Sequence, residues 1–381
     1  MLIVNSSHTM TQQKNTYRLW SLDALRGFDM LFIMGFSGFV IALCALSDAP
    51  FAGWLAEQMR HVEWNGLAHH DTIFPLFLFI AGVSFPFSLA AQRSKGLSEG
   101  RIHWNILRRA LILIALGVVY NGFFKFDFEN MRIASVLGRI GTAWALAALL
   151  YIHCGVRTRG IVAVVILLGY WALSALVPAP DAAAGAEALS REGCLVGYID
   201  RRLLPGKLIW DTFDPEGLLS TLPAVVTAML GNFAGEWVRQ PEERVSGNRK
   251  AAYMAAAGAI MALVAWGWNA VLPVNKMLWS SSFVLAVGSY SLLMFALFYY
   301  IIDVRGWRKW TLFFRVIGLN SITIYLAQKI IDFKRVARFF LGGVADMCPE
   351  DWSKVILTGG YVLACWLFLY FLYKKDTFLK V

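Results

Sequence analysis

Half of the six histidines of this 381-residue chain fall in one short segment, residues 61–71. The segment reads His61-Val-Glu-Trp-Asn-Gly-Leu-Ala-His-His-Asp71. An imidazole exchanges protons near neutral pH and a neighbouring carboxylate can orient it, so these residue types predict general acid–base chemistry. Asp71 is also suited to be the N-cap of the helix that should follow. The residues alone leave open which of His61, His69 and His70 acts, and a solvated or capping role is the simpler interpretation of each.

Polar side chains also recur inside stretches that are otherwise apolar. Two groups share a helix face, and one arginine lies near the end of a third stretch: Arg26, Asp29 and Ser37; Ser321, Tyr325 and Lys329 with Arg315 one step round; and Arg139. Ionisable groups are costly in a bilayer, so they usually line a cavity, carry function or join helices to one another. The two stripes predict a polar cavity inside the protein.

Two further polar motifs precede apolar stretches. The motif at 214–217, Asp-Pro-Glu-Gly, is a strong helix start, because Asp can cap, Pro fits the first turn and Glu complements the helix dipole. The motif at 273–280, Pro-Val-Asn-Lys-Met-Leu-Trp-Ser, has no such local explanation. The candidate ligand contacts in the two motifs are Asp214, Glu216, Asn275, Lys276 and Trp279.

The elements that must position these residues are membrane helices. Of the chain, 58% is hydrophobic and only 16% is charged, which excludes an ordinary soluble enzyme and a disulfide-rich secreted scaffold. About 20 apolar residues are needed to cross a bilayer, and ten stretches qualify: 27–46, 72–91, 107–124, 136–154, 160–178, 217–236, 251–271, 280–302, 312–331 and 354–373. The sequence therefore predicts an all-α polytopic membrane protein with about ten transmembrane helices in one bundle. The first stretch has no Ala-x-Ala cleavage pattern, which predicts a retained helix.

The basic residues set the predicted orientation. Segments 1–26, 92–109, 155–159, 237–250, 303–309 and 374–381 together hold 20 Lys and Arg, whereas the opposite loops hold more acidic than basic residues. This positive-inside bias predicts that both termini are cytoplasmic. It also accounts for the net charge of +10, so nucleic-acid binding is disfavoured. The expected organisation is a cytoplasmic segment 1–26, a transmembrane domain 27–373 with outer loops 47–71, 179–216 and 332–353, and a cytoplasmic tail 374–381.

The five cysteines show no metal-binding pattern. No CxxC or Cys/His cluster is present, so no metal site is predicted. Cys194 and Cys348 both fall in predicted outer loops, where oxidation is chemically accessible, and a disulfide between them is a hypothesis.

Eight motifs in order carry a resemblance that covers nearly the whole chain. They are Arg18-Leu-Trp-Ser-Leu-Asp-Ala-Leu-Arg-Gly27, His61-x-x-Trp-Asn-Gly66, Asp71-x-x-Phe-Pro75 with Phe79-Ile-x-Gly82, Arg132-Ile-x-x-Val-Leu-x-Arg139, Asp214-Pro-Glu-Gly217, Pro273-Val-Asn-Lys276 with Leu278-Trp-Ser280, Asp303-Val and Asn320-Ser-Ile322. The chain resembles the transmembrane acyltransferases typified by heparan-α-glucosaminide N-acetyltransferase, a family with lysosomal and bacterial members. The resemblance implies that an acetyl group passes from cytosolic acetyl-CoA, a co-substrate, to an amino sugar on the far side of the membrane.

The family's active-site histidine falls on His61, and Asp71 is the expected carboxylate that orients it. The family's second active-site residue, an asparagine, is replaced here by Ser37, so a shorter hydroxyl would take its hydrogen-bonding role. Ser37, Asn65 and Asn275 are the candidates to stabilise the oxyanion. Direct transfer is expected rather than an acetyl-histidine intermediate. The remaining expected contacts to acetyl-CoA or the acceptor are Arg26, Asp29, Trp64, Arg139, Asp214, Glu216, Lys276, Trp279, Arg315, Asn320, Ser321 and Lys329.

Two other functions fit the same residues. One is O-acylation of a periplasmic glycan, and the other is solute transport without acyl chemistry, although no paired interrupted spans favour transport. The compact form is typical of bacterial members, which predicts an inner (plasma) membrane protein with the His61 side extracytoplasmic. The expected partners are acetyl-CoA, an amino-sugar acceptor and the lipid bilayer, and a homodimer fits the sequence as well as a monomer does.

Overall fold

The computed structural model describes residues 19–183 and 185–379, and within these ranges the chain forms helices and no strand. Two isolated backbone bridges, Arg132 with Gly206 and Pro178 with Cys194, tie loop segments together. The main helices are α1 (Trp20–Leu31), α2 (Ser37–Cys44), α3 (Pro50–Gln58), α4 (His69–Ser94), α5 (Glu99–Tyr120), α6 (Val136–His153), α7 (Val156–Leu176), α8 (Leu195–Leu203), α9 (Thr221–Val238), α10 (Gly247–Trp268), α11 (Ser281–Phe298), α12 (Leu312–Leu319), α13 (Ser321–Ile330), α14 (Phe333–Asp346) and α15 (Glu350–Lys374). The prediction of an all-α polytopic membrane protein is confirmed.

Eight helices of the described chain are long and apolar enough to cross a membrane, and α12 with α13, bent by 57°, makes a ninth if the pair is one span. These nine match nine of the ten predicted stretches. The tenth, 217–236, is the helix α9, which is 18 residues long but is not among the helices apolar enough to count. By length and composition the described chain thus gives eight or nine candidate spans, close to the predicted ten, and α9 still crosses the bundle between the outer α8 and the inner link to α10.

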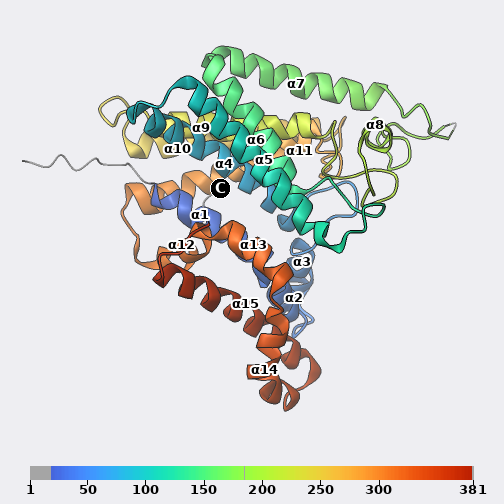
Figure 1. Ribbon diagram of the computed structural model, residues 1–381, viewed down its shortest axis with the longest axis vertical. Helices are drawn as coiled ribbons and strands as arrows, with labels where there is room; N and C mark the ends of the chain where they lie inside the picture. The colour runs from blue at the N-terminus through green and yellow to red at the C-terminus, as the bar shows by residue number, and fades with distance from the viewer. Residues whose placement is uncertain (1–18, 184, 380–381) are drawn as a thin grey trace, which may run out of the picture.

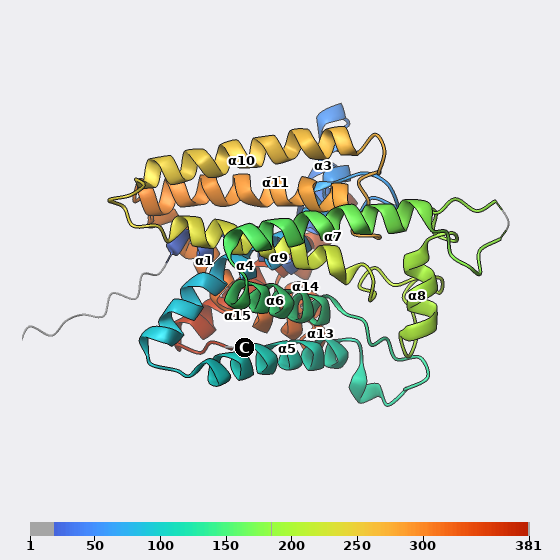
Figure 2. The ribbon, with the colours of Figure 1, turned by 90° about the horizontal axis from the view of Figure 1, so that it is seen from above.

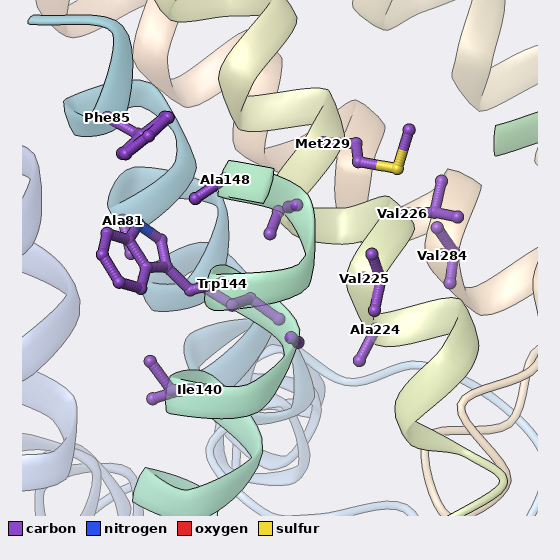
Figure 3. Packing of buried hydrophobic residues seen from close by; sticks show 14 of the residues in the cluster. Ala81, Phe85, Ile140, Trp144, Ala148, Ala224, Val225, Val226, Met229 and Val284 are labelled. Carbon is purple, nitrogen blue, oxygen red and sulfur yellow. The ribbon is translucent and has the colours of Figure 1, made fainter. Parts of the chain in front are cut away.

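The helix α9 lies in the middle of the bundle instead of facing lipid. Twelve of its 18 residues are buried. A Cβ added to Gly231 would lie 2.1 Å from the carbonyl oxygen of Phe79, and one added to Gly235 would lie 2.4 Å from that of Val83. Because glycines four residues apart let two helix backbones touch, α9 packs directly on α4. Figure 3 shows the apolar core on the neighbouring faces: Phe85 of α4 lies near Trp144 of α6, with ring centres 5.7 Å apart, and Met229 and Val226 of α9 lie on the side of Val284.

The helices form two groups, which Figure 1 shows one above the other. Helices α4 to α7 and α9 to α11 make the upper group, and α1, α2 and α12 to α15 make the lower group. Figure 2 shows that the links α4–α5 and α9–α10 lie at the end where α1 begins, here the inner end. The links α5–α6, α7–α8 and α10–α11 lie at the opposite, outer end. The loops thus alternate between the two ends as the charge pattern requires, and the assignment of the inner end to the cytoplasm stays a prediction.

A break in the first span positions the candidate residue Ser37. The short π-helix Phe32–Phe36 separates α1 from α2, and within it Gly35 has φ of 105°. A Cβ there would lie 2.5 Å from the ring of Tyr361, so both the backbone conformation and the space favour glycine. π-Helical turns often mark functional sites, and this one directs Ser37 toward α4.

The structure corrects the predicted helix cap and the hypothesised disulfide, and part of both predicted terminal segments lies outside the described residues. The N-cap of α4 is Ala68, and Asp71 stands three residues later, where its side chain accepts from the Ala68 amide. Cys194 and Cys348 are both free, so the hypothesised disulfide is absent from the structure. Residues 1–18 of the predicted N-terminal segment and 380–381 of the predicted tail lie outside the described residues.

Candidate active site

Three side chains from three segments meet at the outer end of the bundle. Nδ1 of His61, in the loop between α3 and α4, lies 2.7 Å from Oδ1 of Asp71. Nζ of Lys276, in the loop between α10 and α11, lies 3.2 Å from the same oxygen and 2.9 Å from Nδ1 of His61. The His61 side chain is 50% exposed, whereas that of Asp71 is 1% exposed. A buried carboxylate thus holds an accessible imidazole.

The hydrogen bonding fixes the tautomer of His61. A carboxylate only accepts, so the 2.7 Å contact requires a proton on Nδ1 of the imidazole. The ammonium of Lys276 then donates to Asp71, and its approach to Nδ1 is a contact without a shared proton. Nε2 of His61 is left with a free lone pair on the exposed side of the ring. This is the arrangement that a general base needs.

The second carboxylate oxygen of Asp71 shapes the loop that carries His61. It accepts from the amides of Val62 and Ala68, each at 3.2 Å. Burial lowers the pKa of Lys276, and the charge of Asp71 and its hydrogen bond to Lys276 act in the opposite direction. Asp71 therefore fixes His61, its loop and the lysine at once.

A serine–histidine pair lies beside this cluster. Oγ of Ser37 and Nδ1 of His70 are 3.0 Å apart, and the rings of His70 and His61 are 4.4 Å apart. The sequence named His70 only as an alternative to His61, because the resemblance supplies no counterpart for it. The contact with Ser37 joins two segments far apart in the chain, so only the fold reveals it. His69 points elsewhere, with Nε2 3.0 Å from the hydroxyl of Tyr290.

The loops of His61 and Lys276 are joined by direct hydrogen bonds. Nδ2 of Asn275 donates to Oδ1 of Asn65 at 3.0 Å, and the amide of Gly66 donates to the carbonyl of Val274 at 2.7 Å. Oδ1 of Asn275 accepts from the amide of Leu278 at 2.8 Å. The amide group of Asn275 is thus fully used in holding the loops, whereas no hydrogen bond within the described chain engages Nδ2 of Asn65.

The two tryptophans predicted to contact a ligand, Trp279 and Trp64, instead contact other parts of the protein. The side chain of Trp279 is buried, and its ring lies 5.0 Å from the guanidinium of Arg139. Trp64 donates to the carbonyl of Leu189 at 3.0 Å, which ties the His61 loop to the segment before α8. Both tryptophans pack within the protein, and their indole rings are not free platforms for a ligand.

An acidic pair with its own arginine borders the site. Arg132, just before α6, donates to Asp214 at 2.7 and 2.5 Å and also bonds to Glu216. Burial alone would lower the pKa of Arg132, but the hydrogen bonds and charges of Asp214 and Glu216 outweigh it and raise it. Arg139 donates to the carbonyl of Gly217 at 3.1 Å and also bonds to Ser220, so it holds the start of α9.

A narrow slit of about 40 Å³ lies inward of the histidines. It lies between α1, α4, α6 and α13, and its lining includes Ile33, Phe74, Ile140, Ser321 and Tyr325. Phe74 is one helical turn from His70 along α4, whereas Ile33 lies in the π-helical break before Ser37. The slit is therefore close to the serine–histidine pair, although neither Ser37 nor His70 is part of its lining.

The other predicted contacts lie farther inside or at the inner end. Arg26 donates to Oγ of Ser84, which is 13 residues along α4 from Asp71 and thus about 20 Å away. Arg315 lies over the ring of Trp20 at 3.8 Å, and Asp29 is buried in α1. Asn320, at the break between α12 and α13, donates to the carbonyl of Thr377 at 3.1 Å. The structure does not bring these residues to the histidine cluster.

No group of three or more His, Cys, Asp or Glu side chains in the described residues has the geometry to hold a metal ion. The fold and the site together define a polytopic membrane protein whose outer end carries a carboxylate-oriented histidine near a narrow slit between the helices.

Two curated proteins are similar to this chain. It is 28% identical to human heparan-alpha-glucosaminide N-acetyltransferase over 96% of its own length, and 26% identical to the mouse protein over 97%. The chain spans 60% and 62% of the lengths of these two relatives. No family model matches the chain. The matches confirm the resemblance that the motifs indicate, and the chain is a distant relative of these acetyltransferases.

Proposed function

We propose that the protein is a transmembrane acetyltransferase, which moves an acetyl group from acetyl-CoA on the cytoplasmic side to the amine of an amino sugar at the outer end. The contact of His61 with buried Asp71 carries the proposal, because it leaves Nε2 free as a base on the exposed side. The two relatives named as N-acetyltransferases support the reaction type.

In the proposed reaction, the neutral amine of the acceptor attacks the thioester carbonyl carbon. Nε2 of His61 takes a proton from the attacking nitrogen, and Asp71 stabilises the imidazolium that forms. The C–N bond forms and the C–S bond breaks, and the proton passes to the departing thiolate, which leaves as CoA. One imidazole serves both transfers, so an acetylated histidine is not required.

The tetrahedral oxyanion needs a hydrogen-bond donor close to the imidazole. If the hydroxyl of Ser37 donates to Nδ1 of His70, the proton of His70 is on Nε2 and can point to the oxyanion. Nδ2 of Asn65 is a second donor without an internal partner in the described chain. Asn275 is a positioning residue in this scheme, since both ends of its amide hold the two loops together.

The slit near His70 marks the proposed route of the pantetheine arm from the inner side, and its volume of about 40 Å³ requires the helices around it to move apart when the donor binds. Its lining is mostly apolar, with Ser321 and Tyr325 as polar exceptions, which suits a thin chain with few amide groups. Arg26 and Arg315 lie toward the inner end and would meet the phosphates of the donor. We propose that both termini lie in the cytoplasm, because the basic residues collect in the segments at that end.

The test is acceptor-dependent release of CoA from acetyl-CoA by purified protein, with the product identified by mass spectrometry. His61→Ala should lower kcat by about 10²–10⁴-fold, which is the usual contribution of a general base. His103→Ala is the matched control, because His103 contacts His153 through their Nε2 atoms at 2.9 Å, remote from the site at the inner ends of α5 and α6. An amide product resists mild base, whereas an ester product would favour O-acylation. Full activity in His61→Ala would exclude the proposed base.

A further inference from the structure

A second, larger hollow opens at the outer end beside the active-site cluster. It has a volume of about 710 Å³ and lies between the outer ends of α5 and α13. Helix α5 packs along α6 and makes no extensive contact with α13, so the two helices leave a gap between them. The rings of Tyr120 and Tyr325 stack across this gap at 4.4 Å. Tyr325 lines the slit and Tyr120 lines this cavity, so the two hollows lie on opposite sides of the stacked pair.

The lining of the cavity is cationic. Lys125 and Lys329, both exposed, contribute to it together with the half-buried Arg132. Arg132 is engaged by Asp214 and Glu216, whereas neither lysine forms an ion pair with the residues that the structure describes. Nζ of Lys329 lies 4.8 Å from the centre of the Tyr120 ring. Two lysines without acidic partners at one cavity are suited to an anionic group.

The mouth of the cavity is apolar and faces the bilayer. Ile330 is 84% exposed, Phe124 is 67% exposed and Val119 is 38% exposed, and all three line the cavity. Val119 continues the exposed apolar face of α5 that includes Leu111. A sugar that arrives from water gains nothing from such a mouth, whereas an alkyl chain that leaves the cavity there enters lipid directly.

A chain of contacts leads from the cavity to the histidine. Arg132 lines the cavity and bonds to Glu216. Glu216 lies close enough to Lys276 for its charge to act on that amine, and Lys276 contacts His61. Arg132 and Glu216 thus connect the lining of the cavity to the loop that carries Lys276 and to His61.

We propose that the acceptor is a membrane-anchored amino sugar that carries a phosphate: Lys125 and Lys329 bind the phosphate, the sugar extends past Arg132 toward His61, and the lipid chain leaves between α5 and α13. This inference rests on the proposed acetyltransferase function and adds the class of acceptor. The proposed acceptor differs from a soluble sugar in its charge and in its attachment to the bilayer, and the effect of each difference on kcat/KM can be measured separately.

The experiment compares three acceptors in phosphatidylcholine vesicles that contain the protein, with acetyl-CoA as donor. They are methyl glucosaminide, methyl glucosaminyl phosphate and hexadecyl glucosaminyl phosphate. The phosphate should raise kcat/KM by about tenfold or more, which corresponds to one charge-assisted hydrogen bond. Lys329→Ala should remove most of that gain, whereas Lys334→Ala, which removes an exposed lysine of α14, should not.

The lipid chain is tested by narrowing the mouth. Ile330→Trp should lower, relative to the wild type, the ratio of kcat/KM for hexadecyl glucosaminyl phosphate to that for methyl glucosaminyl phosphate. Partitioning into the vesicles is the same for both proteins and cancels in this comparison. Native mass spectrometry should show retained hexadecyl glucosaminyl phosphate in the wild type and loss of it in Lys329→Ala, independently of turnover. If the wild type acetylates all three acceptors with equal kcat/KM, the inference is overturned while the acetyltransferase function stands. The same holds if neither Lys329→Ala nor Ile330→Trp changes the ratios of kcat/KM among the acceptors. If no acceptor is acetylated but the lipid is bound through Lys329, the proposed function fails and the binding site stands.

Discussion

Replacing Asp71 by Asn tests how the site holds its base. The carboxylate accepts from His61 and Lys276 on one oxygen and from two backbone amides on the other. An asparagine can keep the backbone bonds through its carbonyl oxygen, but its NH₂ group then faces Nδ1–H of His61 and the ammonium of Lys276. Donors meet donors, so the imidazole must rotate or carry its proton on Nε2, the atom that should accept the proton of the amine.

The expected loss of kcat in Asp71→Asn is about 10²–10⁴-fold, as for other histidine bases that lose their orienting carboxylate. Stability should fall as well, because Lys276 loses its partner while its side chain is only 16% exposed. Breaking a buried ion pair on one side costs about 3–5 kcal/mol. Adding Lys276→Met removes the unpaired charge, so the double variant should recover thermal stability without recovering kcat.

The two effects are read by different assays: amide formation from acetyl-CoA for kcat, and thermal unfolding in detergent for stability. A folded Asp71→Asn protein with kcat within about threefold of the wild type would refute the orienting role. Recovery of kcat in the double variant would show instead that the ion pair acts only through stability.

Three further changes test other parts of the structure. Burial raises the pKa of Asp200 to about 6, so the folded state binds more protons than the unfolded state between about pH 4 and 6. The free energy of unfolding should therefore fall by about 3 kcal/mol as pH rises through that range. Asp200→Asn should flatten this part of the plot of melting temperature against pH, and an unchanged slope would assign the pH dependence to other groups. Gly35→Ala should destabilise the protein by about 1–3 kcal/mol because of the positive φ of residue 35 and the nearby Tyr361 ring. Gly38→Ala is the control, because no atom lies within 4 Å of the new Cβ. Equal melting temperatures of the two variants would contradict the role of the π-helical break. Ser37→Ala should lower kcat at nearly constant KM for acetyl-CoA if it acts through His70, and Ser37→Asn should retain more activity than Ser37→Ala; the opposite order would remove Ser37 from the scheme.

The membrane architecture could be predicted from the sequence because long apolar stretches and the sorting of charges depend on local composition. All ten predicted stretches form helices, and nine of them, with α12 and α13 taken as one, are long and apolar enough to span a membrane. The tenth, α9, is less apolar, and its glycines at 231 and 235 place it against α4 rather than lipid. The sequence shows these small residues at a four-residue spacing, but it does not show which helix they contact.

The active-site cluster was predictable only in part. His61 and Asp71 lie ten residues apart in one motif, so their association was expected, whereas the contribution of Lys276 depends on a loop more than 200 residues away. The contact of Ser37 with His70 depends on a π-helical break that no simple periodicity reveals. Arg139 shows the reverse case: a buried arginine suggested a phosphate contact, and in the structure it holds the start of α9.

The most direct test of the account separates donor and acceptor across a membrane. Oriented vesicles are loaded so that acetyl-CoA is present only on the side of the α4–α5 and α9–α10 links, and the amino sugar only on the side of His61. The account predicts acetylated amino sugar in the His61 compartment with the wild type, and a loss of about 10²–10⁴-fold in His61→Ala. Product that forms only when both substrates share one compartment, or that forms equally well in His61→Ala, would contradict it.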